Sequence, residues 1–96
     1  MIDVEGIYFA VSDENRRKLL ALLAQHGSLT VGELVGLRLL PQPTISRQLA
    51  VLRAAGLVTR RKSGTGRIYT LVPGALDGVV AELTELKHAA VMDGTE

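Results

Sequence analysis

The middle of the chain carries side chains that suit a polyanionic partner. Residues 41–70 hold six basic side chains and no acidic one, whereas residues 1–40 carry a net charge of −1 and residues 71–96 a net charge of −4. The charges sum to +1 over the whole chain, so the total hides the basic centre. A basic segment between two acidic ends favours contact with phosphate groups. The basic residues of the centre are Arg47, Arg53, Arg60, Arg61, Lys62 and Arg67.

A cluster of hydrogen-bonding side chains opens the helix that is predicted in this centre. Ile45, Leu49 and Leu52 recur at helical spacing within residues 44–55 and form one narrow apolar stripe. In the DNA major groove, arginine suits the O6 and N7 atoms of guanine, and glutamine suits adenine. Hydroxyl groups near a helix N-terminus suit phosphate oxygens. The residues expected to contact double-stranded DNA here are Gln42, Thr44, Ser46, Arg47 and Gln48.

A second basic group follows in a predicted β-hairpin. Residues 57–62 and 67–72 are rich in β-branched and long side chains, and residues 63–66 supply two glycines between them. This pattern predicts two antiparallel strands joined by a short turn. Long cationic side chains on such a hairpin can lie along the phosphate backbone or enter the minor groove. The expected contacts from the hairpin are Arg60, Arg61, Lys62 and Arg67.

Helices before the basic centre must hold these groups in place. Ser12 is expected to cap a helix that carries a broad leucine face and ends at Gly27. Thr30 and Glu33 have capping-box spacing and predict a second, short helix that ends at about Leu39. Two prolines then separate this helix from the one that contacts DNA. A connection of only a few residues forces a sharp angle, which is typical of a helix-turn-helix.

The two ends of the chain complete the predicted fold. Residues 75–92 form an amphipathic helix, and residues 7–11 form an apolar stretch at the other end. The expected fold class is mainly α with a β-hairpin wing, a winged helix-turn-helix in which four helices precede the hairpin and one follows it. The length allows one domain, which we place over residues 1–96. An apolar fraction of 47% is high for so short a chain and indicates a surface that another subunit covers.

The composition also argues against several functions. The absence of cysteine excludes disulfides, thiolate metal ligands and a cysteine nucleophile. No catalytic Ser/His/Asp set, phosphate-binding glycine loop or paired-carboxylate site is evident, so an enzyme is not expected. The N-terminus is acidic where a secretory signal is basic, and no apolar run approaches the roughly 20 residues of a membrane span. We therefore expect a cytoplasmic protein that does not bind membranes.

Three segments of the chain resemble the ArsR/SmtB family of bacterial repressors. Residues 42–58 (QPTISRQLAVLRAAGLV) resemble that family's recognition helix, residues 12–20 its second-helix opening, and residues 66–71 its returning wing strand. The resemblance implies a homodimeric winged-helix repressor whose first and last helices form the dimer interface. By position, it implies that Gln42, Thr44, Ser46, Arg47 and Gln48 face the major groove and that Arg60, Arg61, Lys62 and Arg67 contact DNA from the wing.

Apolar residues at both ends agree with the dimer that the resemblance implies. They supply more apolar surface than one small core needs. In a two-fold dimer, the two recognition helices bind half-sites about one helical turn apart in a palindromic operator. The residues that supply this surplus apolar surface are Ile2, Val4, Ile7, Tyr8, Leu83, Leu86, Ala90 and Val91.

The sequence does not match the metal-binding motifs of the family's metal-sensing members. Residues 30–34 (TVGEL) stand where metal-sensing members often have a Cys-Val-Cys type of motif, and Asp77 lacks the histidine two residues later that a second family site uses. Glu85 and His88 lie about one helical turn apart. They could contribute to a nickel or zinc site shared across a dimer, or form an ordinary solvated helix face. A divalent metal, a small organic molecule and no inducer at all stay open as alternatives.

Two functions from different classes fit these residues. The first is a sequence-specific, dimeric transcriptional regulator. The alternative is a winged-helix interaction module that binds DNA weakly alone and acts with a protein co-regulator. Val51 and Ala54, beside Arg47, suit an apolar contact with such a protein as well as contact with thymine methyl groups.

Overall fold

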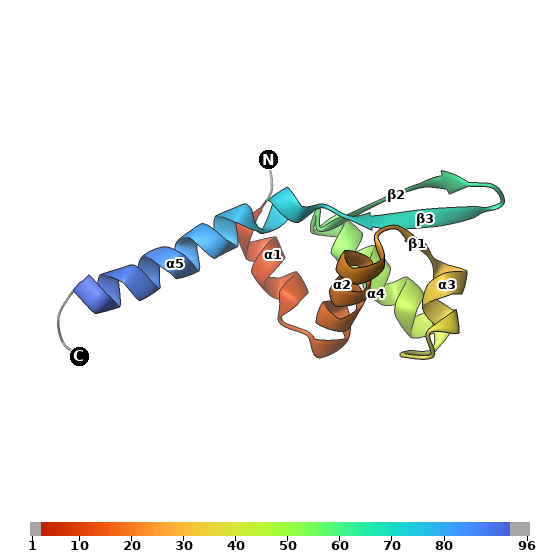
Figure 1. The fold of residues 1–96 in the computed structure, drawn as a ribbon, viewed down its shortest axis with the longest axis horizontal. Coiled ribbons are helices and arrows are strands. Elements are labelled where there is room, and N and C mark those ends of the chain that lie inside the picture. Colours follow the sequence, from red (N-terminus) through yellow and green to blue (C-terminus); the bar gives the residue numbers. More distant parts are fainter. Residues whose placement is uncertain (1–2, 93–96) are drawn as a thin grey trace.

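The structure is a computed structural model that describes residues 3–92. Four α-helices lie together on one side of a small sheet, and a fifth extends away from them (Figure 1). The α-helices are α1 (Val4–Val11), α2 (Glu14–His26), α3 (Val31–Gly36), α4 (Gln42–Ala54) and α5 (Asp77–Met92). The strands are β1 (Leu29–Thr30), β2 (Val58–Ser63) and β3 (Gly66–Leu71), and a 3₁₀ turn, η1 (Pro73–Leu76), precedes α5. The predicted winged helix-turn-helix is confirmed.

One hydrophobic core joins the helices to the sheet. The stripe predicted for α4 is confirmed, because Ile45, Leu49 and Leu52 are fully buried. Burial of an aliphatic side chain of this size stabilises the fold by about 1.5–3 kcal/mol, so the stripe fixes which face of α4 turns outward. The other buried apolar residues are Ile7, Ala10, Leu19, Leu23, Leu29, Leu34, Leu57, Val58, Tyr69, Ala75 and Val79.

The junction between α1 and α2 differs from the prediction by one residue. Asp13, not Ser12, is the N-cap of α2, and its carboxylate accepts a hydrogen bond from the backbone N–H of Arg16 (3.1 Å). Ser12 instead ends α1, where its hydroxyl donates to the Phe9 carbonyl (2.7 Å). The apolar stretch before Ser12 is helical, so the chain still has helical dihedral angles when it reaches this serine. Gly27 ends α2 with a φ of 84°, as predicted.

The helix-turn-helix consists of α3, a short connection and α4. The predicted capping box is confirmed. The Thr30 hydroxyl accepts from the Glu33 N–H (3.0 Å), and the Glu33 carboxylate accepts from the Thr30 N–H (2.8 Å). Helix α3 ends at Gly36, before the predicted end at Leu39. Arg38 then has a φ of 58°, and this left-handed conformation prevents the helix from continuing.

The wing is the β2–β3 hairpin, within a sheet of strand order β1-β3-β2. The register pairs Ser63 with Gly66, so both strands reach one residue closer to the tip than predicted. Gly64 and Thr65 form the turn, and Gly64 has a φ of 61°. A positive φ at the first of two turn residues is typical of a type II′ turn, in which glycine is favoured.

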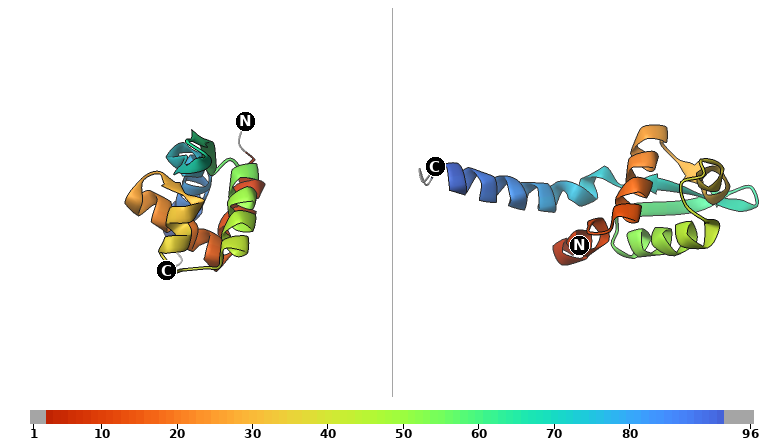
Figure 2. Two further views of the ribbon diagram at one scale, coloured as in Figure 1. Left: turned by 90° about the vertical axis from the view of Figure 1, so that its right-hand side faces the viewer. Right: turned by 90° about the horizontal axis from the view of Figure 1, so that it is seen from below.

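Helix α5 leaves the body of the molecule and gives it a long axis of 56 Å (Figures 1 and 2). Its first turn packs closely on α1, where a Cβ added to Gly78 would lie 3.3 Å from the side chain of Val4. Farther along α5, Leu83, Leu86 and Val91 are 51%, 64% and 70% exposed. No described helix, α5 included, is long and apolar enough to cross a membrane.

Helix α1 offers less surface to a second subunit than predicted. Ile7 is fully buried in the core of its own chain, so it adds no apolar surface for a second subunit. Ile7 and Ala10 are three residues apart and both lie on the inner face of α1. Val4 and Tyr8 are half-buried, and Ile2 lies outside the described residues.

Candidate nucleic-acid interface

The outer face of α4 is polar and basic. Ser46, Ala50 and Arg53 follow one another at i, i+4 and i+7 and are exposed. Arg47 and Gln42 are exposed as well. Helix α4 has no side-chain cap and no acidic residue in its first turn, so its N-terminal N–H groups can meet an acceptor from outside the chain. Three of the predicted DNA contacts, Gln42, Ser46 and Arg47, therefore point outward.

Two other predicted contacts on α4 are less open. Thr44 and Gln48 are half-buried. The side-chain oxygen of Gln48 accepts a hydrogen bond from Nη1 of Arg16 (2.9 Å). Gln48 therefore lies at the edge of the exposed face and is held there by a residue of α2.

Arg16 is a buried charged residue that the sequence interpretation missed. The sequence pattern assigns Arg16 no role, yet only 8% of its surface is exposed. Its Nε donates to the Ala10 carbonyl (2.7 Å) and its Nη2 to the Phe9 carbonyl (2.9 Å). The guanidinium also lies 4.9 Å from the centre of the Phe9 ring. Helical spacing could have found it, because Arg16 precedes the buried Leu19 by three residues and Leu23 by seven.

The wing carries its basic side chains on two faces. Residues directly opposite in an antiparallel ladder share a face, and successive pairs alternate between faces. The pairs Arg60–Tyr69 and Lys62–Arg67 therefore lie on one face, and Arg61 lies on the other. Tyr69 is buried against the core, so the face with three basic residues is the one that turns toward the helices. The phenol oxygen of Tyr69 accepts a long hydrogen bond from Nη1 of Arg60 (3.4 Å).

Lys62 and Arg67 bring two like charges together at the end of the wing. They are directly opposite in the ladder, an arrangement that destabilises a hairpin. Among residues 3–92, the one ion pair joins Lys18 of α2 to Glu14 (3.4 Å). No described carboxylate therefore neutralises the wing, which leaves its charges available to an external anion.

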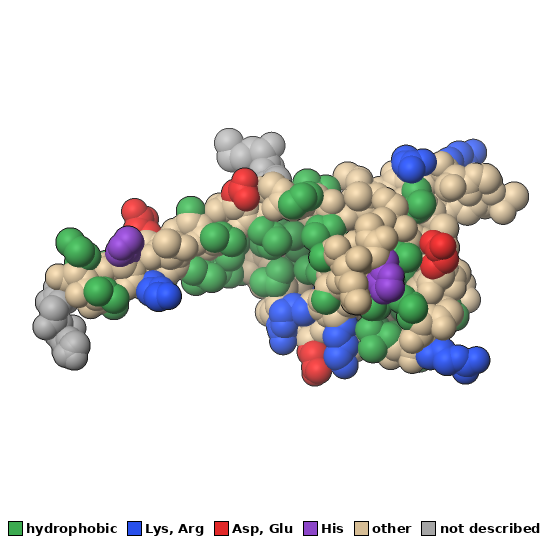
Figure 3. Space-filling model, in the orientation of Figure 1, with side chains coloured by type: hydrophobic (Ala, Val, Ile, Leu, Met, Phe, Trp, Pro, Cys, Tyr) green, Lys and Arg blue, Asp and Glu red, His purple; other side chains and the backbone are tan. Residues whose placement is uncertain are grey.

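The basic face of α4 continues into the wing. Arg53 of α4 and Arg60 of β2 line one shallow hollow of about 370 Å³, together with Gly56, Val58 and Thr59. The sequence interpretation does not assign a contact to Arg53, although its spacing from Ser46 puts both on the exposed stripe. Figure 3 shows basic side chains on the hairpin and along the lower edge of the body, and apolar side chains gathered along α5 and its junction with the body.

Comparison with known proteins identifies the family. The sequence model described as "Bacterial regulatory protein, arsR family" matches residues 13–60, which include α2, α3 and α4. The chain belongs to the arsR family. It is 38% identical over 80 residues to an uncharacterized HTH-type transcriptional regulator of Methanocaldococcus jannaschii, a match that covers 83% of this chain and 90% of that protein. It is also 39% identical over 67 residues to the arsenical resistance operon repressor of Escherichia coli K12, covering 70% of this chain and 57% of the repressor.

Solved structures of arsR-family proteins have the same fold. A crystal structure of an ArsR family transcriptional regulator superposes with a TM-score of 0.78 at 26% identity, covering 93% of this chain and 95% of the other. The resemblance noted in the sequence is thus confirmed. The arsR family and these relatives are transcriptional regulators, so this chain is a regulator and not an enzyme.

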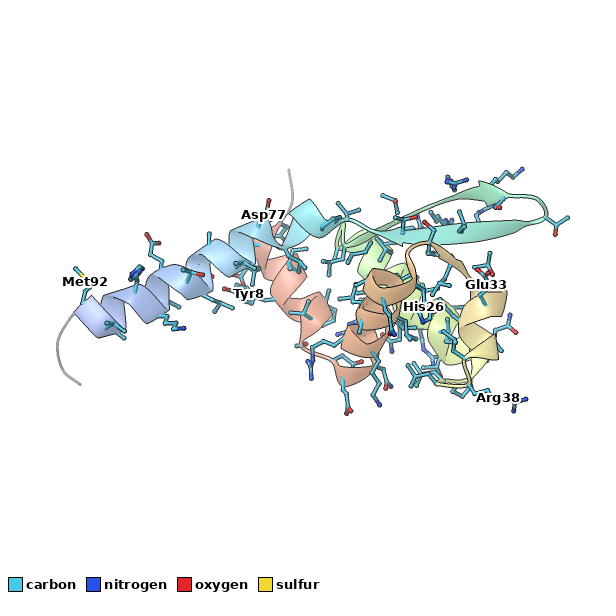
Figure 4. All side chains as sticks on the ribbon, in the orientation of Figure 1. Tyr8, His26, Glu33, Arg38, Asp77 and Met92 are labelled. Atoms are coloured by element: carbon cyan, nitrogen blue, oxygen red, sulfur yellow. The ribbon has the colours of Figure 1, made fainter. Side chains whose placement is uncertain are left out.

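The described part of this arsR-family chain offers few metal ligands. Residues 3–92 contain no group of three or more His, Asp or Glu side chains placed to hold a metal ion. Glu85 and His88 are exposed on α5, whereas His26 lies at the end of α2, away from the Met92 end of α5 (Figure 4). At about 100° per residue, His88 is roughly 140° around α5 from Leu83 and about 60° from Val91, so it borders the apolar face. Because zinc takes about four ligands, Glu85 and His88 need further ligands from another chain or from solvent.

Proposed function

We propose that this chain is a homodimeric transcriptional repressor that binds a palindromic double-stranded DNA operator and is released by an unidentified signal. One continuous basic surface carries the proposal. It runs from the exposed face of α4, past the hollow lined by Arg53 and Arg60, to the opposed pair of Lys62 and Arg67. A phosphate backbone supplies the negative charges that the described part of this surface lacks. Repression itself is inferred from the E. coli relative that is named a repressor.

Each part of the basic surface has a separate role in this proposal. Ser46 and Arg47 reach base edges in the major groove, where arginine favours guanine. Gln42 and Thr44 lie in the first turn of α4 and suit a phosphate at the helix N-terminus. Arg60, Arg61, Lys62 and Arg67 hold the phosphate backbone from the wing and carry little sequence information.

The proposed dimer forms through α5 and the adjoining part of α1. Leu83, Leu86 and Val91 are exposed apolar side chains along one helix, and monomeric proteins rarely leave such a strip uncovered. The wing and α4 lie at the opposite end of the molecule from α5. A two-fold axis near α5 therefore leaves the basic surfaces of both subunits free (Figure 1). Two α4 helices then meet the two half-sites of a palindrome.

Titration of DNA at two salt concentrations tests the proposal. The two duplexes are the DNA upstream of the protein's own coding region and a random duplex of equal length. We expect tight binding to the native duplex, and a logarithm of affinity that falls steeply with the logarithm of salt concentration. Arg47→Ala should reduce discrimination between the duplexes, whereas Arg60→Ala with Arg61→Ala should weaken both about equally.

Two results would redirect the proposal. Equal and weak binding to both duplexes contradicts sequence-specific binding by this chain alone. If tight binding then appears when a second protein from the same cell is added, the alternative of an interaction module with a protein co-regulator is supported instead.

A further inference from the structure

We propose that Arg16 is a positioning residue. It determines which edge of the Gln48 side-chain amide faces DNA when α4 binds. Gln48 then serves as a hydrogen-bond donor only, and its partner on DNA is an acceptor. The proposal rests on the proposed function, because it concerns a DNA contact of α4.

The chemistry of Arg16 fixes the orientation of the amide. A guanidinium has five N–H donors and no acceptor. The atom of Gln48 that lies 2.9 Å from Nη1 of Arg16 must therefore be the oxygen, because an amide nitrogen there would set two donors against each other. The amide nitrogen of Gln48 consequently points away from Arg16.

Arg16 is held firmly enough to impose this orientation. Its Nε and Nη2 donate to the carbonyls of Ala10 and Phe9, and its guanidinium lies over the Phe9 ring. With 8% of its surface exposed, Arg16 has little access to water. If Gln48 turned away, a buried and charged N–H would lose its acceptor, which is unfavourable.

The amide nitrogen of Gln48 reaches solvent at the edge of the DNA-facing surface. Gln48 is half-buried, and its one side-chain hydrogen bond to a described residue uses the oxygen. Yet no described side-chain nitrogen or oxygen is both buried and without a partner. The nitrogen is therefore accessible, one turn along α4 from Thr44.

A fixed amide recognises different groups from a free one. A free glutamine pairs with adenine by donating to N7 and accepting from the N6 amino group. Here Arg16 takes the accepting side, and the outward side only donates. Suitable partners are N7 of either purine, O6 of guanine, O4 of thymine, or a phosphate oxygen, and the two-bond pairing with adenine is lost. The expectation that Gln48 reads adenine is replaced by an expectation of an acceptor.

The first test changes the outward atom and keeps the contact with Arg16. In Gln48→Glu, one carboxylate oxygen still accepts from Arg16, and the outward NH₂ becomes an oxygen. We expect unchanged or higher thermal stability, since the bond to Arg16 becomes charge-assisted. We also expect affinity for the native duplex to fall about tenfold or more, because an acceptor now faces an acceptor. Gln48→Met removes the donor without adding charge and should lower affinity by a smaller factor.

The second test frees the amide. In Arg16→Lys the charge remains, but a single ammonium cannot span both α1 carbonyls and Gln48. Binding is measured to duplexes that carry each of the four bases at each half-site position. We expect the preference at one position to flatten or to move toward adenine. Arg17→Lys is the matched control, because the exposed Arg17 donates to the Val11 carbonyl (2.6 Å) and not to Gln48.

A double variant separates positioning from a purely structural role. In the Gln48→Met background, Arg16→Lys should no longer alter base preference, whereas a structural defect would act equally in both backgrounds. If Gln48 donates to a base, Gln48→Met changes preference at one position. If it donates to phosphate, Gln48→Met weakens all sequences equally.

The outcomes that overturn the proposal are specific. It is wrong if Gln48→Glu keeps wild-type affinity for the native duplex, and this result decides the question even if Arg16→Lys does not fold. It is also wrong if Arg16→Lys has the same effect on binding with and without Gln48. If the wild-type chain itself does not distinguish native from random DNA, the proposed function fails and the Arg16–Gln48 contact is structural.

Discussion

The hydroxyl of Tyr8 donates a hydrogen bond to the carboxylate of Glu82 and so joins α1 to α5. Tyr8 lies at the junction of the two helices, just before α5 leaves the body (Figure 4). This hydrogen bond raises the pKa of Tyr8 to about 12, with smaller contributions from burial and from the negative charges of Glu82 and Glu5. Together with the close approach of Gly78 to Val4, the bond fixes the base of the helix on which we place the dimer interface.

Tyr8→Phe should lower stability in a way that depends on pH. A tyrosine in the unfolded chain has a pKa near 10, and Tyr8 in the folded chain has one of about 12. The stabilisation is therefore fully present below pH 10 and is lost as the pH rises toward 12. Chemical denaturation of both proteins at pH 8 and pH 11 measures this, and the difference should be larger at pH 8. Equal stability of the two proteins at pH 8 would show that the bond contributes nothing.

Lys62→Gln should have opposite effects on stability and on DNA binding. Removing one of two opposed like charges relieves repulsion with Arg67, so the free protein should be as stable as wild type or more stable by a few tenths of a kcal/mol. The same change should reduce the slope of log affinity against log salt by about 0.9, the value for one lost phosphate contact.

Arg61→Gln is the matched control for the wing. It removes the same charge from the opposite face of the hairpin, where Ile68 and not a cation is its partner. We expect no gain in stability from Arg61→Gln. A gain equal to that of Lys62→Gln would show that the stability change reflects net charge and not the opposed pair.

The sequence predicts the elements of this fold well because most of them depend on local rules. The stripe of Ile45, Leu49 and Leu52 and the capping box of Thr30 and Glu33 need only helical spacing and adjacent residues. The features that the sequence does not predict depend on contacts between residues far apart in the chain. Gln48 is constrained because a guanidinium 32 residues earlier lies beside it.

The burial of Ile7 and the orientation of the wing also depend on contacts between residues that are far apart in the chain. Ile7 is apolar whether it faces the core or a partner, and only the packing of α1 on the other helices decides between them. The four basic wing residues are visible in the sequence. Their division into three on one face and one on the other follows from the register, but only the packing of Tyr69 against the core decides which of these faces turns toward the helices.

Arg38→Gly should stabilise the chain relative to Arg38→Ala. Arg38 has a φ of 58°, a left-handed conformation that costs a residue with a Cβ about 1–2 kcal/mol and costs glycine little. Both substitutions remove the same charge, and only glycine removes the steric cost. The melting temperature of Arg38→Gly should therefore exceed that of Arg38→Ala by roughly 4–8 °C, the shift expected for about 1 kcal/mol. Equal melting temperatures would indicate that the turn relaxes when the arginine is replaced.

Leu83→Glu should break the proposed dimer and leave the chain folded. Leu83 is 51% exposed, so a charge there costs the single chain little. Buried at an interface between two chains, the same carboxylate is strongly unfavourable. Analytical ultracentrifugation should show a monomer, and affinity for a palindrome should fall while affinity for a single half-site stays the same. Ala81→Glu, about 200° around the helix from Leu83, is the control and should stay dimeric; a dimeric Leu83→Glu would place the interface elsewhere.

Zinc or nickel should have little effect on DNA binding through α5. Glu85 and His88 supply two ligands on an exposed helix, and His88 lies at the edge of the apolar face that we place at the dimer interface. Two ligands leave most of the coordination sphere of either ion to water, so binding there should be weak and should not couple to α4. Operator affinity measured with and without each ion, for wild type and for His88→Ala, should be the same in all cases. A change in affinity that an ion causes in wild type and not in His88→Ala would instead establish a metal site at His88, with its missing ligands supplied by the second chain.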